Sequence, residues 1–244
     1  MVVSNPKLRQ ERHVMPCVTS VIKFNERYNG MSMHSCVLFL SAMIGFILSD
    51  KIFSQDSGAN AAASADAVYP IKVGATVPTL TLATADGKPF DVSKAIRHKP
   101  TVLVFYRGGW CPYCNMQLKQ LVEVESKLLA LGYQLFAIST DKPEKLQETL
   151  AKDKLNYTLL SDSKMIGCSA FGIAFKVEEQ LVQKYKSYNI DLEVASGETH
   201  HLLPVPSVFI VGTDGIIKFS YVNPNYKVRL DPDVMLAAAK AALK

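Results

Sequence analysis

The sequence predicts an α/β domain with a mixed central sheet, helices on both faces of that sheet and an added N-terminal β-hairpin. Three observations predict this class. Segments of strand and helix character alternate after about residue 69. Residues 101–106 (TVLVFY) are apolar throughout, which is typical of a strand buried on both faces. Turn residues between short apolar runs indicate one hairpin near the start of this region and another near its end.

The elements can be placed in order along the chain. The predicted strands are residues 79–83, 90–92, 101–106, 133–139, 157–160, 208–211 and 216–222. The predicted helices are residues 111–131, 141–154, 164–175, 178–188 and 233–244. Asp86-Gly87 supplies the first hairpin turn, and Gly132 ends the first helix. Asp141 and Glu144 have the spacing of a capping box, and the helix at 178–188 lies within a more irregular insert that reaches Leu203.

The first 68 residues differ in character from the rest. No Asp, Glu, Lys or Arg occurs in residues 28–49, whose densest part, residues 36–48, is almost wholly apolar and follows cationic residues. A cleaved export signal and an uncleaved membrane anchor both fit this length, and a buried core helix is the third interpretation. We therefore expect residues 1–68 to be a signal or anchor plus a flexible linker. Residues 69–244 would form a redox domain that is exported, periplasmic or anchored at the membrane outside the cytoplasm.

Composition narrows the function. The net charge is +5, but much of it lies in residues 1–30, and no Lys/Arg cluster interleaved with aromatic residues occurs in the body of the chain. A nucleic-acid partner is therefore not expected. The five cysteines, at positions 17, 36, 111, 114 and 168, include one close pair. This is not the pattern of a small disulfide-stapled domain, which needs several spaced pairs.

The informative motif is Cys111-Pro112-Tyr113-Cys114, placed where a buried strand turns into a helix. Cys111 falls at the helix N-terminus, where unpaired N–H groups and the helix dipole favour a thiolate. Cys114, three residues on, lies on the same face and can close a redox-active disulfide with Cys111. Arg107 adds a positive charge that would lower the Cys111 pKa further. The chemistry needs no metal or other cofactor.

Other interpretations of this motif remain open. The two cysteines could form half of a zinc site, with His200-His201 as the adjacent candidate ligands, although neighbouring histidines rarely bind one metal well. They could also be buried inert thiols or a structural disulfide. Arg107 could be a solvated surface residue. Trp110 and Tyr113 are expected to pack near the thiols as lid residues and to contact a substrate.

From about Ile71 onward the chain resembles the peroxiredoxin-like branch of the alkyl hydroperoxide reductase C / thiol-specific antioxidant family. The segments that carry the resemblance are Phe105–Cys114, Pro204–Ile210, Asp214-Gly215 and Tyr221–Arg229. The resemblance implies a thioredoxin-like fold with an added N-terminal hairpin. It also implies that Pro206, just before a strand, is a cis-proline facing the cysteine pair, and that the backbone of Val205 pairs with an extended substrate. A trans proline at a strand entrance is the alternative.

The chain departs from ordinary peroxiredoxins at the site itself. Counted from Phe105, Cys114 stands in the register of the peroxidatic cysteine. Arg107 then replaces the family's proline, Cys111 replaces its threonine, and Pro206 falls where the family has an arginine. The scaffold resembles a peroxiredoxin, whereas the motif resembles a thioredoxin.

These features favour an oxidoreductase that performs thiol–disulfide exchange, in which Cys111 attacks and Cys114 resolves. The alternative is a thiol-dependent peroxidase that reduces hydroperoxides, and a third hypothesis is a redox-inert adaptor. Catalytic roles are predicted for Cys111, Cys114, Arg107 and Pro206, and substrate contacts for Trp110, Tyr113 and Val205. The expected partners are a thiol donor protein or glutathione and a disulfide or hydroperoxide substrate. The N-terminal segment would contact the membrane.

Overall fold

The computed structural model describes residues 61–153, 155 and 157–243. The apolar segment at residues 28–49 lies outside the described residues, so its role as a signal or anchor stays a prediction. Within the described part of the chain, no helix combines the length and the apolar character needed to cross a membrane.

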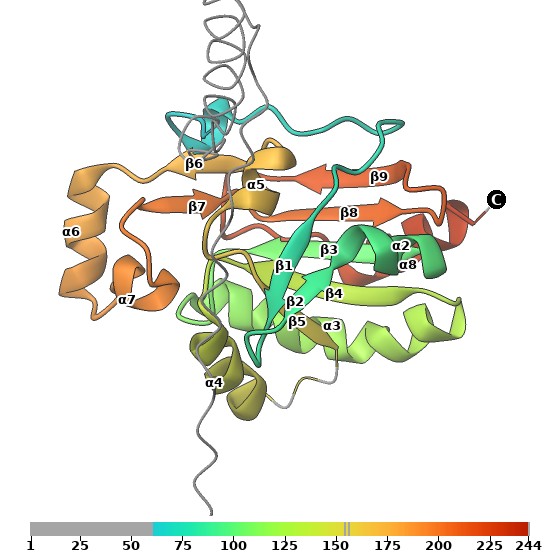
Figure 1. The fold of residues 1–244 in the computed structure, drawn as a ribbon, viewed down its shortest axis with the longest axis horizontal. Helices are drawn as coiled ribbons and strands as arrows, with labels where there is room; N and C mark the ends of the chain where they lie inside the picture. The colour runs from blue at the N-terminus through green and yellow to red at the C-terminus, as the bar shows by residue number, and fades with distance from the viewer. Residues whose placement is uncertain (1–60, 154, 156, 244) are drawn as a thin grey trace, which may run out of the picture. The chain divides into compact units, whose positions relative to one another are not determined.

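The described residues form a seven-stranded sheet in the order β2-β1-β5-β4-β3-β8-β9 (Figure 1). The strands are β1 (Thr81–Thr84), β2 (Pro89–Asp91), β3 (Thr101–Tyr106), β4 (Gln134–Ser139), β5 (Thr158–Ser161), β8 (Ser207–Val211) and β9 (Ile217–Val222). Strands β3, β4 and β5 are parallel, whereas β1 pairs antiparallel with β5 and β8 pairs antiparallel with β3. Both predicted hairpins form, as β1–β2 and β8–β9. The predicted mixed sheet is confirmed.

Strand β3 is buried on both faces, as its apolar sequence predicts. Val102, Val104 and Tyr106 belong to a core on one face, and Leu103 and Phe105 to a core on the other. The first core packs under α3 (Pro112–Ala130) and α8 (Pro232–Ala241), and the second under α2 (Val92–His98) and α5 (Ile166–Ala170). Helices therefore cover both faces of the sheet, and the redox motif follows directly from its most buried strand.

Helix α2 was not predicted. Val92 was expected to end a strand, but the Asp91 carboxylate accepts a hydrogen bond from the backbone N–H of Lys94 (2.8 Å) and starts a helix there. Helix α5 is shorter than the predicted 164–175. The chain reverses at Gly172, which has a φ of +66°, and then enters β6 (Ala174–Lys176).

The insert is more regular than expected. It holds α6 (Glu179–Ser187) and α7 (Leu192–Ser196), and β7 (Leu202–Pro204) pairs with β6 as a separate two-stranded sheet. Figure 1 shows α6 and α7 together at one end of the central sheet, beyond β6 and β7. Their small core includes Val182 and Leu192, and Trp110 of the redox motif packs against it. The insert therefore reaches the predicted site.

The described chain is already paired before residue 69, where the linker was expected to end. Ala62 donates a hydrogen bond to the carbonyl of Ala174 (2.9 Å) and accepts one from Lys176 (2.8 Å). Ile71 donates to the carbonyl of Phe171 (3.0 Å), next to Gly172. A Cβ atom at Gly172 would collide with the backbone carbonyl of Tyr69. The entry of the chain into the domain therefore requires glycine at this position.

We expect Gly172→Ala to destabilise the fold more than Gly132→Ala. Both glycines have positive φ, so each substitution carries a backbone cost of about 1–2 kcal/mol. A Cβ at Gly132 meets nothing within 4 Å, whereas at Gly172 it also meets backbone, which adds about 1–3 kcal/mol. Urea denaturation of the two variants measures the difference. Equal losses of stability would contradict the close approach of Tyr69.

Candidate active site

Cys111 and Cys114 lie where β3 turns into α3. Cys111 is the N-cap residue of α3, and Pro112 occupies the first helical turn, where no N–H partner is needed. Both cysteines are free thiols, and both are buried, with exposed fractions of 2% for Cys111 and 0% for Cys114. The predicted strand–turn–helix placement is confirmed, whereas the disulfide between them stays a prediction.

Two glycines make the turn between β3 and α3 fit its surroundings. Gly108 has a φ of +150°, and a Cβ there would collide with the Trp110 indole and come 2.7 Å from Oδ1 of Asp141. A Cβ at Gly109 would collide with Oγ1 of Thr149 on α4 (Pro143–Asp153). We call residues 107–111, between β3 and α3, the redox loop. Because no side chain fits at either glycine, the backbone of this loop packs directly against α4 and Asp141.

The surroundings make Cys111 the more acidic thiol. Its pKa is lowered to about 6, mainly by the hydrogen bond with the Cys114 side chain and then by the charge of Arg107, the N–H of Cys114 and the charge of Arg229, while burial opposes the shift. Burial and the neighbouring Cys111 raise the pKa of Cys114 well above its ordinary value. At neutral pH the pair therefore holds one thiolate, on Cys111, and one protonated thiol, on Cys114.

Arg107 is buried inside an aromatic cage rather than solvated. Its exposed fraction is 3%, and its guanidinium lies 4.2 Å from the ring centre of Tyr226, 5.1 Å from that of Trp110 and 5.4 Å from that of Tyr185. It also donates a hydrogen bond to the hydroxyl of Tyr185 on α6. Rings of this kind stabilise a cation by their quadrupoles. The alternative of a surface role for Arg107 is wrong.

Arg229 is a site residue that the sequence reasoning missed. Its Nη2 donates to Sγ of Cys114 at 3.4 Å, and its Nη1 donates to the carbonyl of Tyr226. Among the described residues, no carboxylate lies within ion-pair distance of Arg229 or Arg107. The sequence feature that could have identified Arg229 is its position at the end of the Tyr221–Arg229 segment, which carries the family resemblance. An arginine thus reaches the thiols from the loop after β9, although Pro206 holds the position where the family has one.

Trp110 and Tyr113 pack against the core cluster that contains Cys111 and Cys114. Both are half-buried; the Trp110 ring packs on Tyr185 (5.8 Å between centroids) and the Tyr113 ring on Tyr226 (5.7 Å). The packing role is therefore confirmed, while contact with a substrate stays a prediction.

The predicted cis geometry of Pro206 is wrong, whereas a catalytic role for Pro206 and a substrate contact at Val205 stay predictions. The described residues contain no cis peptide bond, so the Val205–Pro206 bond is trans and carries the extended chain from β7 into β8. Val205 is buried, its N–H donates to the carbonyl of Ile173 (2.8 Å), and its carbonyl accepts from the Ser207 hydroxyl (2.7 Å). These local partners occupy the N–H of Val205 and one lone pair of its carbonyl, so the backbone here is already engaged within the fold.

The zinc alternative finds no support in the described part of the chain, where no group of three potential ligands is positioned to hold a metal ion. Nε2 of His200 bonds the carbonyl of Ser163 (2.7 Å). Nε2 of His201 bonds the Glu193 carboxylate (2.7 Å). The two adjacent histidines therefore serve separate local contacts.

Asp141 has a different role from the one that its sequence position predicts. It was expected to cap α4, but its Oδ2 instead accepts the N–H of Gly109 (2.6 Å) and Oδ1 has no hydrogen-bond partner in the described chain. Its exposed fraction is 1%, and burial raises its pKa to about 7. The hydrogen bond from the N–H of Gly109 holds the carboxylate on the redox loop, so it does not cap α4.

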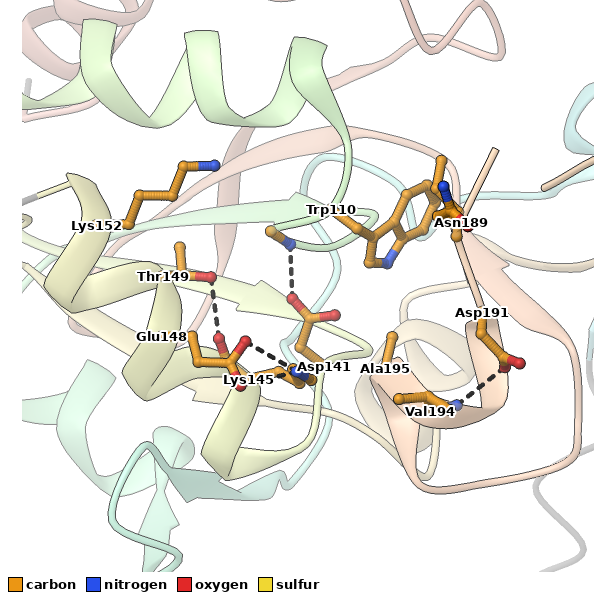
Figure 2. Close-up of a pocket in the computed structure, with 12 residues that line it drawn as sticks. Trp110, Asp141, Lys145, Glu148, Thr149, Lys152, Asn189, Asp191, Val194 and Ala195 are labelled. Atoms are coloured by element: carbon orange, nitrogen blue, oxygen red, sulfur yellow. Dashed lines mark hydrogen bonds and ion pairs between the residues drawn. The ribbon is translucent and has the colours of Figure 1, made fainter. Parts of the chain in front are cut away.

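A cavity of about 280 Å³ opens beside this carboxylate (Figure 2). The redox loop, α4 and the insert supply its walls, which are formed by Gly109, Trp110, Asp141, Lys145, Glu148, Thr149, Lys152, Asn189, Ile190, Asp191, Val194 and Ala195. Figure 2 shows Asp141 between the α4 side chains and Trp110. No sequence pattern indicates this cavity, because the three segments that line it are far apart in the chain.

Comparison with known proteins finds relatives that are named peroxiredoxins. The model of the AhpC/TSA family matches residues 73–220, more than half of the chain. Peroxiredoxin Bcp of Escherichia coli K12 is 34% identical over 104 residues, which cover 43% of this chain and 66% of the relative. The chloroplastic Peroxiredoxin Q of Sedum lineare is 35% identical over 89 residues, covering 36% of this chain and 47% of the relative. The chain therefore spans less than two thirds of the length of either relative.

Solved structures agree on the fold. Peroxidoxin BcpB from Mycobacterium tuberculosis superposes with a TM-score of 0.55 at 20% identity, over 70% of this chain and 97% of that chain. A peroxiredoxin-like protein from Aquifex aeolicus superposes with a TM-score of 0.55 at 16% identity, over 71% of this chain and 89% of that chain. The mixed sheet with its flanking helices is therefore the thioredoxin-like fold that the sequence predicted.

We expect Cys111 to ionise with a midpoint near pH 6 and Cys114 to stay protonated at that pH. The test is iodoacetamide alkylation of Cys114→Ser and Cys111→Ser from pH 4 to 9, followed peptide by peptide by mass spectrometry. Serine at 114 keeps a hydroxyl donor for the thiolate, so Cys114→Ala should move the Cys111 midpoint upward. Arg107→Met should do the same because it removes a stabilising charge. Faster labelling of Cys114 at low pH would reverse the assignment.

The raised pKa of Asp141 predicts a pH-dependent cost in stability. A folded-state pKa near 7 against about 3.9 in the unfolded chain means that the folded protein holds an extra proton between these values. Stability should therefore fall as the pH rises through this window, by on the order of 3–4 kcal/mol. Asp141→Asn, which can still accept from Gly109, should gain stability relative to the parent between pH 4 and pH 8.

Urea denaturation at the two pH values measures this gain. The lowered pKa of Cys111 contributes the opposite slope between about pH 6 and 8.5, but it is present in both proteins and cancels in the difference. Asp86→Asn, at an exposed carboxyl whose pKa is lowered, is the control and should show no such gain. The same stability difference at both pH values would mean that folding does not raise the Asp141 pKa.

Proposed function

The chain belongs to the AhpC/TSA family, and on that premise we propose that it is an oxidoreductase that reduces hydroperoxides with thiols. The observation that carries the proposal is the Cys111 thiol, acidic and buried beside two arginines that lack carboxylate partners in the described chain. The Cys-x-x-Cys motif taken by itself favours thiol–disulfide exchange. The relatives are named peroxiredoxins, and that favours the peroxidase.

Access to Cys111 supports the same choice. Exchange requires a disulfide sulfur to reach the thiolate in line with its own S–S bond, and a protein disulfide brings bulky surroundings with it. With 2% of Cys111 exposed, a small hydroperoxide reaches the sulfur more easily than such a substrate does. The backbone of Val205 is also engaged within the fold, which disfavours its pairing with an extended peptide.

The proposed cycle begins with the Cys111 thiolate. It attacks the terminal oxygen of the hydroperoxide, the O–O bond breaks, and the released alkoxide takes a proton to leave as alcohol or water. Cys111 becomes a sulfenic acid, which condenses with the Cys114 thiol to form the disulfide and one water. Two thiols from an external donor then reduce the disulfide and are themselves oxidised.

The arginines and the second cysteine have distinct roles in this cycle. Arg107 and Arg229 keep Cys111 ionised and stabilise the negative charge that develops on the leaving oxygen. The Cys111 thiolate is one cause of the high pKa of Cys114. Oxidation of Cys111 to a neutral sulfenic acid removes that charge, so the first step makes Cys114 easier to deprotonate for the second.

Exchange remains a second candidate because an acidic cysteine at a helix N-terminus with a partner three residues on suits that chemistry as well. The family register counted from Phe105 instead makes Cys114 the attacking cysteine of a peroxidase. Export of the domain remains a prediction from residues 28–49.

We expect Cys114→Ser to form one sulfenic acid per molecule on Cys111 without turnover, and Cys111→Ser to form none. Dimedone trapping and mass spectrometry on each variant after one equivalent of hydrogen peroxide check this. Arg229→Met should lower the second-order rate constant with peroxide by about one to two orders of magnitude, because the transition state loses one charge-assisted hydrogen bond. Lys227→Met, two residues away and exposed, is the matched control.

Two outcomes would change the proposal. A sulfenic acid that forms on Cys114 when Cys111 is absent would support the family register and reverse the cysteine roles. A small disulfide that reacts faster than hydrogen peroxide with the wild-type chain would favour the exchange enzyme.

A further inference from the structure

The cavity beside the redox loop contains polar groups that the fold leaves without partners. Asp141 has an exposed fraction of only 1%, and its Oδ1 has no hydrogen-bond partner in the described chain, although the Ser139 hydroxyl lies near enough to the carboxyl to lower its pKa. The indole N–H of Trp110, also buried, has no hydrogen-bond partner among the described residues either. Both atoms border the position where a Cβ of Gly108 would stand, and since Gly108 is not a lining residue, they meet on the redox-loop side of the cavity wall. Buried polar groups without partners are rare in folded proteins and point to a missing ligand or water.

The other charged groups of the cavity are already engaged. Lys145 pairs with Glu148 (2.8 Å), and Asp191 accepts from the backbone of Glu193 and Val194 at the start of α7. Lys152 has no carboxylate within ion-pair distance in the described chain. What the cavity offers a ligand is the Asp141 carboxyl as an acceptor, Lys152 and the Trp110 indole as donors, and the Asn189 amide, which both donates and accepts. Figure 2 shows Lys152 on the α4 side of the cavity and Trp110 on the opposite side of Asp141.

An acceptor and a cation in the same cavity suit a ligand that carries both a positive and a negative charge. An α-amino acid end offers an ammonium to the Asp141 carboxylate and a carboxylate to Lys152, whereas a singly charged ligand would satisfy only one of them. The apolar part of the wall, with Ile190, Val194 and Ala195, suits a short aliphatic chain. A cavity of about 280 Å³ is near the lower end of the range for small-molecule sites, so it fits a compact molecule rather than a protein segment.

We propose that this cavity binds the reducing thiol of the cycle, a small zwitterionic thiol of the cysteine or glutathione class, by its α-amino acid end. The inference rests on the proposed function, which needs a thiol donor. The cavity wall at Gly109 and Trp110 is the redox loop itself, and Cys111 is the next residue. Neither Cys111 nor Cys114 lines the cavity, so a donor held there by its α-amino acid end would have to extend its thiol past the Gly109–Trp110 wall to reach the disulfide.

The reducing step balances with two such thiols. The thiolate of the first attacks Sγ of Cys111, the S–S bond to Cys114 breaks, and Cys114 leaves as a thiolate that takes a proton. The second thiol attacks the mixed disulfide at the donor's sulfur and releases the Cys111 thiolate. The two donors leave as one disulfide, and the cysteine pair is reduced.

The first experiment measures binding without any redox step. S-methylglutathione, which has no free thiol, is titrated into the full 244-residue chain and followed by calorimetry. We expect saturable binding that weakens by roughly ten- to hundredfold in Asp141→Asn and in Lys152→Met, because each loses a charge-assisted contact. Lys94→Met on α2, which contributes nothing to the cavity, makes the same change in net charge as Lys152→Met and should bind like the wild type. N-acetyl-S-methylglutathione, which lacks the ammonium, should bind to the wild type as weakly as S-methylglutathione binds to Asp141→Asn.

The second experiment separates donor binding from catalysis. In peroxide turnover, Lys152→Met should raise the KM for glutathione about tenfold relative to the KM for dithiothreitol, which carries no charge. Cysteine as donor tells whether the amino acid end alone is enough. No binding of S-methylglutathione, or equal binding by wild type and both variants, would overturn the proposal and leave a bridging water between Asp141 and Trp110. Absence of peroxide turnover with intact, variant-sensitive binding would instead overturn the proposed function alone.

Discussion

The placement of two guanidinium groups beside one buried cysteine pair is the constraint around which the site is organised. Arg107 is buried, Arg229 is partly buried, and in the described chain neither has a carboxylate within ion-pair distance. Taking a charge out of water without a counter-charge costs several kcal/mol. The Cys111 thiolate is the anion that offsets this cost, and the arginines in turn keep it ionised. The aromatic cage of Tyr226, Trp110 and Tyr185 supplies the remaining stabilisation for Arg107.

This electrostatic pairing requires elements far apart in the sequence to meet at one loop. Tyr185 comes from the insert, Tyr226 and Arg229 follow β9, and the thiols begin α3. The turn at Gly108 and Gly109 makes room for them, because it lets the loop backbone lie directly against Thr149 and Asp141. A substitution at either glycine would therefore disturb the thiolate environment through packing rather than through charge. The insert belongs to the site for the same reason, since its core packs on Trp110.

Local patterns in the sequence predict the elements, whereas tertiary contacts decide the site. The sheet, both hairpins and the helix that begins at the cysteine pair follow from strand patterning, turn residues and helix capping. Asp141 has the spacing of a cap, yet a stronger competitor, the N–H of Gly109, takes its carboxylate. Arg229 lies 115 residues from Cys114 along the chain, so no local pattern could assign it to the thiols. The cis geometry expected at Pro206 came from the family resemblance and not from a local pattern, and the trans bond found there joins β7 to β8.

Trp110 connects the two halves of the proposed chemistry. Its ring lies 5.1 Å from the Arg107 guanidinium, and the residue also lines the cavity that holds Asp141. The ring is one of the three that surround Arg107. Arg107 in turn lowers the Cys111 pKa. The proposed donor site and the charge that lowers the Cys111 pKa therefore share one side chain. The peroxide step needs a small positive site, and the reducing step needs a larger one with both charges. In the proposed cycle, Trp110 contacts the site of the peroxide step and lines the site of the reducing step, so the same loop contributes to both sites.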